Sequence, residues 1–246
     1  MRCALGDATR RATGIGRRQY VAAMGVHGMD FLAIREQSVR RLRRWKLSDP
    51  GSLPLHGDED FEWVRDTAAV ADRCHAIAAA LALAHRAPVQ TVRDAIDEYG
   101  LEPSLGARER ELLRVLEGDE EADEETMHQL LVDICWREEA LHALLWVLGL
   151  VEDLPPDRMC PRQPAYERLA PGLHPGRARA ELRMRPLSEI AAMLDIYYSL
   201  HWHARKAQYH GDVWDYQIAP GVVLERRRAL EWLFQDAPWE DVDLAV

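Results

Sequence analysis

The chain has 246 residues, of which 48% are hydrophobic, and its formal net charge is −10. This hydrophobic share is typical of a globular protein and excludes an intrinsically disordered one, while the acidic charge disfavours general nucleic-acid binding. The four cysteines include no CxxC pair, which excludes a zinc knuckle and a disulfide framework and predicts reduced thiols in a cytoplasmic protein. We find no signal peptide and no stretch of about 18 apolar residues, so no membrane association is expected.

The amino-terminal residues 1–29 show no sustained hydrophobic period and contain five glycines. We interpret them as a disordered tail, or as a segment that precedes a true translation start at Met24 or Met29. Residues 1–46 carry eleven basic side chains against three acidic ones, so only this part of the chain could contact phosphate groups.

The first expected helix covers residues 30–46, where Asp30 is placed to cap the free amides. Arginines between Arg35 and Arg44 flank its apolar stripe, and such a run is usually a solvated face. The alternative is a surface that binds phosphate or acidic groups, which requires these arginines to form one exposed patch.

Three further helices are expected before the middle of the chain. The first covers about residues 60–86 and is rich in alanine, which suits close helix packing. The second begins with Pro88 at its first position and ends at Gly100, and the third is a short helix capped by Ser104.

The stretch from residue 126 to 150 is the expected central helix. Between Ala140 and Leu150 only His142 is polar, so this part of the helix has no face suited to water. A helix that is apolar all round is either a core helix or a membrane span. Because a membrane span needs about 20 residues, this pattern predicts the central helix of a soluble domain.

Residues 151–187 contain seven prolines and are expected to form a long irregular crossover. Two helices should follow, over about residues 187–210 and 220–235, with Trp239 and Val242 anchoring an extended tail. The sequence therefore predicts an all-α protein.

About eight helices are expected, arranged around the 126–150 helix in one domain that spans residues 30–246.

Several segments of this chain resemble the bacterial DUF4272 family, a domain of unknown function. They are Arg73 within the alanine-rich helix, WREEALHALLWVLGL at 136–150, HWHAR at 201–205, LERRRALEWL at 224–233 and WEDVDL at 239–244. The last residues, LAV, depart from the family's usual WDDVDLDT ending. The resemblance implies a bacterial, cytosolic helical domain over residues 30–246, and it brings no catalytic residue with it.

Glu138 falls within the apolar stripe of the central helix, and Glu139 lies beside it. A carboxylate on a buried stripe must be paired or hydrogen-bonded, so we predict a buried ion pair that involves one of these two residues. The candidate partners on neighbouring helices are Arg73, Arg205, Arg226 and Arg227.

Glu139 and His142 form a Glu-x-x-His pair, the spacing that di-iron bundle proteins use for metal ligands. Such sites need a second pair on a facing helix, and no other expected helix has one, so neither a metal nor another cofactor is expected. His201, His203 and His210 are expected to hydrogen-bond at the edge of the core or to face solvent. An acid–base or metal site becomes credible only if Glu139, His142 and His201 converge.

These patterns favour a non-catalytic protein, an accessory, regulatory or immunity-type module that binds a protein partner. Trp214, in a polar loop, is the candidate for an exposed partner contact. The competing hypothesis is a small metal-dependent or acid–base hydrolase that uses Glu139, His142 and the histidines of residues 201–210. Nucleic acid is not an expected partner, and the oligomeric state is not predicted.

Overall fold

The computed structural model describes residues 28–161, 174–212, 214 and 217–246. Within these ranges the chain forms eight α-helices and no strand, as predicted. The α-helices are α2 (Phe31–Leu42), α3 (Thr67–Ala84), α4 (Val89–Tyr99), α5 (Ala107–Glu117), α6 (Glu124–Val147), α8 (Pro175–Glu181), α9 (Leu187–His210) and α10 (Pro220–Trp232). The 3-10 helices are η1 (Arg43–Trp45), η2 (Asp58–Phe61), η3 (Glu102–Ser104) and η4 (Trp239–Asp241).

Helix α6 is the centre of the fold, as the sequence predicted. It begins two residues earlier than expected because the Asp123 carboxylate accepts the amide of Thr126 at 2.8 Å, and it ends at Val147. All residues from 137 to 148 are buried, whereas most of the first two turns are exposed. The carboxyl-terminal half of α6 therefore lies in the core and its amino-terminal half reaches towards solvent.

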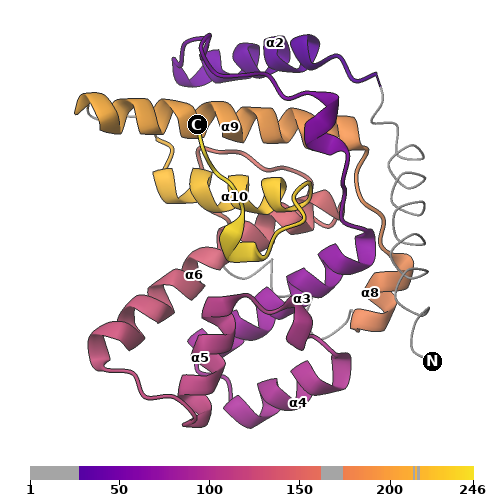
Figure 1. Cartoon of the computed structure of the whole chain (residues 1–246), viewed down its shortest axis with the longest axis vertical. Coiled ribbons are helices and arrows are strands. Elements are labelled where there is room, and N and C mark those ends of the chain that lie inside the picture. The colour runs from indigo at the N-terminus through magenta and orange to yellow at the C-terminus, as the bar shows by residue number, and fades with distance from the viewer. Residues whose placement is uncertain (1–27, 162–173, 213, 215–216) are drawn as a thin grey trace, which may run out of the picture.

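The helices pack on one another in a series from α2 to α3 (Figure 1). Helix α2 lies on α9, α9 on α10, α10 on α6, and α6 on α3, which α4, α5 and α8 surround. The final segment crosses α10, and Trp239 and Val242 are buried in the core as predicted.

The expected helix over residues 60–86 is divided in two. An irregular segment separates η2 from α3, and α3 begins only after Asp66, whose carboxylate accepts the amide of Ala69 at 2.8 Å. Arg65 holds this segment away from a helical path, since its guanidinium donates to backbone carbonyls beyond α10, including that of Gln235 at 2.9 Å. It also lies 4.1 Å from the ring centroid of Trp232.

Two expected helix starts were also placed wrongly. Ser104 does not cap α5, because it belongs to η3, and Gly106 is the residue that precedes the helix. The Glu109 carboxylate accepts the Gly106 amide at 2.7 Å and so supplies the cap from within the helix. Pro88 precedes α4 as its cap residue and does not occupy the first helical position.

The crossover at residues 151–187 is not irregular throughout, because it contains α8. Pro175 occupies the first turn of this helix, where a missing amide costs nothing. The Arg179 guanidinium lies 2.6 Å from Asp72 of α3 and fastens α8 to the fold. The expectations for residues 1–27 and 162–173 lie outside the described residues.

Helix α3 is long and apolar enough to cross a membrane, with a mean hydropathy of 1.3 over 18 residues. The expectation that no such stretch exists was therefore wrong. Half of the stretch is buried inside the protein, and the guanidinium of Arg73 within it pairs with Glu109 of α5. Core helices meet the same criteria of length and composition, and α3 packs against four neighbouring helices as a core helix does.

Gly221 sets how closely α10 approaches α6. An added Cβ would lie 2.7 Å from Cη2 of Trp136, so Gly221→Ala should lower the free energy of unfolding by about 1–3 kcal/mol through overpacking. Urea unfolding measures this change. Gly51→Ala is the control, because its Cβ meets no atom within 4 Å. Equal effects of the two substitutions, or no relief of the first by Trp136→Leu, would contradict close packing at this position.

Candidate functional site

The expected buried ion pair joins Glu139 of α6 to Arg226 of α10. Nη2 of Arg226 lies 2.6 Å from Oε2 of Glu139, and Nε donates to the same oxygen at 2.8 Å. The side chains are only 1% and 2% exposed, so the two charges neutralise each other away from water. Of the four arginines considered from the sequence, Arg226 is thus the one that meets this carboxylate.

The same guanidinium also holds the loop that follows α6. Arg226 donates to the backbone carbonyls of Pro155 at 2.6 Å and Arg158 at 2.9 Å. The free oxygen of Glu139 accepts the amide of Cys160 at 2.8 Å. Because every one of these bonds ends on the backbone, the ion pair fixes the path of residues 155–160 whatever their side chains.

Tyr197 of α9 completes the cluster. Its hydroxyl accepts from Nη1 of Arg226 at 2.9 Å and donates to the carbonyl of Leu154 at 3.2 Å. Burial raises the pKa of this phenol to about 12, so it remains a protonated donor at neutral pH. Three helices and one loop therefore meet at a single buried guanidinium.

The other arginines considered from the sequence have different partners. Arg73 is buried against Glu109, with 2.7 Å between Nη2 and Oε1, and its guanidinium lies over the ring of Trp239. Arg227 pairs with Glu231 on its own helix at 3.1 Å. Arg205 is exposed at the surface.

Glu138 is buried and lines a cavity of 420 Å³ beside α6. Cys135 and Cys160 lie in the same lining, together with His85 at the end of α3 and His128 of α6. Burial, and then the adjacent Glu139 carboxylate, raises the pKa of the Cys160 thiol. This thiol therefore stays protonated at neutral pH and is a poor nucleophile.

The residues proposed for a metal or acid–base site are not grouped as metal ligands. Among the described residues, which include Glu139, His142 and His201, no group of three or more His, Cys, Asp or Glu side chains could hold a metal ion. His203 is bonded to the carbonyl of Ser48 at 2.9 Å, and His210 is exposed at the end of α9. The histidines of this segment thus have separate environments.

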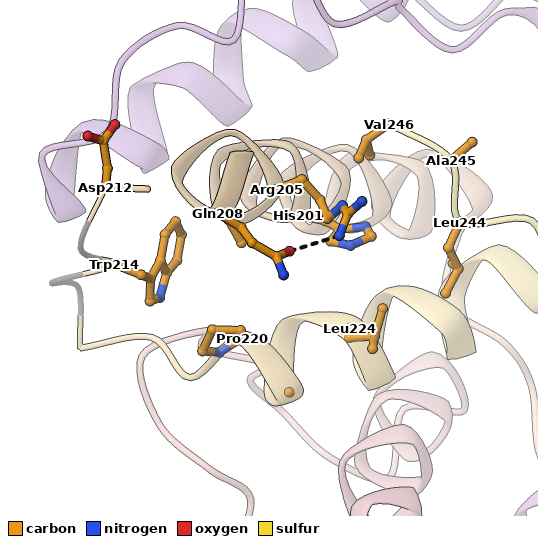
Figure 2. Close-up of a pocket in the computed structure, with 12 residues that line it drawn as sticks. His201, Arg205, Gln208, Asp212, Trp214, Pro220, Leu224, Leu244, Ala245 and Val246 are labelled. Atoms are coloured by element: carbon orange, nitrogen blue, oxygen red, sulfur yellow. Dashed lines mark hydrogen bonds between the residues drawn. The ribbon is translucent and has the colours of Figure 1, made fainter. Parts of the chain in front are cut away.

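A larger cavity, of 820 Å³, lies between the end of α9, the start of α10 and the last residues of the chain (Figure 2). We call it the cleft. Its lining is mostly apolar. The lining residues are His201, Ala204, Arg205, Gln208, Asp212, Trp214, Pro220, Gly221, Leu224, Leu244, Ala245 and Val246. Figure 2 shows that Trp214 lies at one end of the cleft and Leu244 at the other. Small-molecule and peptide sites share this character, a concave apolar surface with a few polar groups.

His201 contributes a neutral polar group to the cleft. Its Nδ1 lies 2.5 Å from Nη1 of Arg227, and since a guanidinium can only donate, Nδ1 must accept and the ring proton must sit on Nε2. Burial, and then the positive charges of Arg227 and Arg205, lowers the pKa of His201 to about 4. The imidazole is therefore uncharged at neutral pH.

The wall formed by the last residues is held through its backbone. Arg227 donates to the carbonyls of Leu244 at 2.9 Å and Ala245 at 3.0 Å. Gln235 accepts the amide of Asp243 at 2.7 Å and donates to the carbonyl of the same residue at 3.1 Å. Residues 243–245 are thereby attached to α10 and to the segment that follows it, and they close one side of the cleft.

Trp214 is half-buried and packs against the core, so it is less exposed than the sequence suggested. Its indole N–H donates to the carbonyl of Ile218 at 2.5 Å. Its ring lines the cleft, and its role in partner binding remains a prediction.

Gln208, Leu224 and Leu244 were not considered as site residues from the sequence. One signal could have indicated this region: Arg205 and Lys206 stand among aromatic residues in a segment, 196–211, that contains no aspartate or glutamate.

Residues 35–242 match the model of the family described as a domain of unknown function, DUF4272. The chain belongs to this DUF4272 family. The match covers most of the chain, including α6, α9, α10 and the ion pair between Glu139 and Arg226. Leu244 to Val246, which form one wall of the cleft, lie beyond the matched part of the DUF4272 domain. No curated protein and no solved structure matches the chain.

Removing one partner of the central ion pair should strongly destabilise the protein. We expect Arg226→Met to lower the free energy of unfolding by about 3–5 kcal/mol, because Glu139 is then left as an uncompensated buried charge. Urea denaturation measures the loss. Arg177→Met is the control, since its pair with Glu181 is exposed and screened by solvent, and its loss should change stability little. Similar losses in the two variants would contradict the expectation that Glu139 becomes an uncompensated buried charge when Arg226 is replaced.

The lowered pKa of His201 predicts a pH dependence of stability. His201 has a pKa of about 6.5 in the unfolded chain and about 4 in the folded protein. Between these pH values the imidazole is protonated in the unfolded chain and neutral in the folded protein, which favours unfolding. The free energy of unfolding should therefore fall as the pH falls from 6.5 to 4. His201→Gln should reduce this fall by the contribution of one proton, as measured by urea unfolding over the pH range. His203, whose pKa is also lowered, is present in both proteins and cancels. If stability depends on pH in the same way in wild type and His201→Gln, the pKa of His201 is not lowered by folding.

Proposed function

We propose that the protein is a non-catalytic accessory or regulatory module, and that the cleft accepts an apolar segment of a protein partner. The observation that carries this proposal is the apolar cavity of 820 Å³, walled by Trp214, Leu224 and Leu244. Apolar surface that a partner can remove from water is the main source of affinity in protein association. Tryptophan is also enriched among the residues that dominate binding energy.

The environments of the acid–base candidates support a binding role over a catalytic one. The Glu139 carboxylate is occupied by Arg226 and by the amide of Cys160, so it cannot accept a proton from a substrate without breaking these bonds. His201 shares its basic nitrogen with Arg227. A general base needs a lone pair open to the substrate, whereas the oxygens of Glu139 and Nδ1 of His201 already accept hydrogen bonds. The pKa of His201 is also lowered to about 4. The hydrolase hypothesis therefore gains no support from Glu139 and His201.

We propose a bacterial, cytoplasmic protein on two grounds. The family resemblance implies a bacterial origin, and the buried cysteines Cys74 and Cys160 are free thiols, as expected in a reducing compartment. Nucleic acid is not proposed as a partner, because the arginine run of α2 is not one exposed patch. Arg35 is buried, and its Nη2 lies 2.9 Å from Asp195 of α9.

Filling the cleft tests the proposal. Leu224→Trp places a larger side chain in the cavity, so it should abolish recovery of a partner in affinity capture followed by mass spectrometry. Leu32→Trp is the matched control, because Leu32 is 65% exposed on α2, outside the cleft. Trp214→Ala should reduce recovery in the same assay. Thermal unfolding checks that all variants are folded, and recovery of the same partner by wild type and Leu224→Trp would exclude the cleft as the binding site.

A further inference from the structure

The last two turns of α9 carry a cluster of basic and aromatic side chains next to the cleft. Another cavity, of 380 Å³, is lined there by Trp202, Arg205, Lys206, Tyr209 and His210, and also by Ser52 and Val246. We call these five residues of α9 the basic shelf. Arg205 lines both the shelf and the cleft, so the two sites are adjacent.

The shelf is positively charged in a protein that is acidic as a whole. No aspartate or glutamate occurs between residues 196 and 211, and none lines the shelf. Arg205 and Lys206 are both exposed, and Lys206 is one of only two lysines in the chain. The carboxylate of Asp212 lies at the Trp214 end of the cleft, on the far side from Leu244 (Figure 2). Local charge and overall charge therefore have opposite signs here.

The aromatic rings of Trp202 and Tyr209 add apolar surface to the shelf. The ammonium of Lys206 lies 4.7 Å from the ring centroid of Trp202, a cation–π distance. Tyr209 is 87% exposed, the highest value among the exposed large apolar side chains of the described residues. Tyrosine and arginine are both enriched at protein interfaces, where an exposed aromatic ring supplies contact area at low entropic cost.

We propose that the shelf selects a partner segment in which acidic residues stand next to the apolar residues that enter the cleft. The inference rests on the proposed function and adds the chemical class of the partner. Charge complementarity carries it: a carboxylate placed beside the apolar insertion meets Arg205 at the border of the two cavities and Lys206 beyond it. Such complementary charges set specificity and association rate more than affinity alone.

Selection from a display library of random peptides against the full chain tests this inference. Enriched peptides should contain aspartate or glutamate close to aliphatic or aromatic residues. Binding of an enriched, fluorescently labelled peptide, followed by anisotropy, should weaken about tenfold or more in Arg205→Gln/Lys206→Gln, which corresponds to about 1.4 kcal/mol. It should also weaken between about 0.1 M and 1 M salt, as the screening length falls from about 10 Å to 3 Å.

The double variant Arg108→Gln/Arg114→Gln is the matched control, since it removes the same charge from exposed positions on α5 and should leave binding unchanged. Enriched peptides without acidic residues, or unchanged affinity in Arg205→Gln/Lys206→Gln, would overturn the inference while sensitivity to Leu224→Trp still supports the cleft. Sensitivity to the shelf variant alone would support the shelf and refute the cleft. Failure to enrich any peptide, or Arg205-dependent binding only to phosphatidylglycerol vesicles, would refute both.

Discussion

The structure depends on one charged contact inside its core. Arg226 and Glu139 are desolvated together. The other N–H groups of Arg226 and the second oxygen of Glu139 bond to Tyr197 of α9 or to the loop after α6. Such a pair adds little net stability over apolar packing, but its directional bonds permit only one arrangement of the surrounding segments. The ion pair thereby fixes α10 on α6, and so also the position of the cleft between α10 and α9.

Much of the fold was predictable because the helix caps and the spacing of apolar residues predict the same helices that the core buries. The apolar run around His142 can only be a core helix, and Asp30 caps α2 as expected. The errors lie where tertiary contacts override local pattern. Helix α8 has seven residues in a proline-rich segment, and its bond from Arg179 to α3 could not be foreseen from sequence. The irregular segment before α3 is held by Arg65 in the same way.

The candidate site was predictable only in pieces. Burial required a partner for Glu139, but the sequence could not say which of four arginines it would be, since that choice depends on helix packing. His201 and Trp214 were considered for different roles, yet both line the cleft. A cavity formed by the end of one helix, the start of another and a distant tail has no linear pattern. The basic shelf, by contrast, is visible in the sequence as Arg205 and Lys206 beside aromatic residues, with no carboxylate between residues 196 and 211.

Residues 243–245 are attached to the fold through their backbone, whereas the side chains of Leu244 and Ala245 form the surface of the cleft wall. Arg227 and Gln235 grip carbonyls and an amide, groups that every residue other than proline possesses. The exposed side chain of Ala245 can therefore change without loosening the wall, whereas the side chain of Leu244 also packs against the core. Replacement of Ala245 alone would then reshape one side of the cleft at little structural cost.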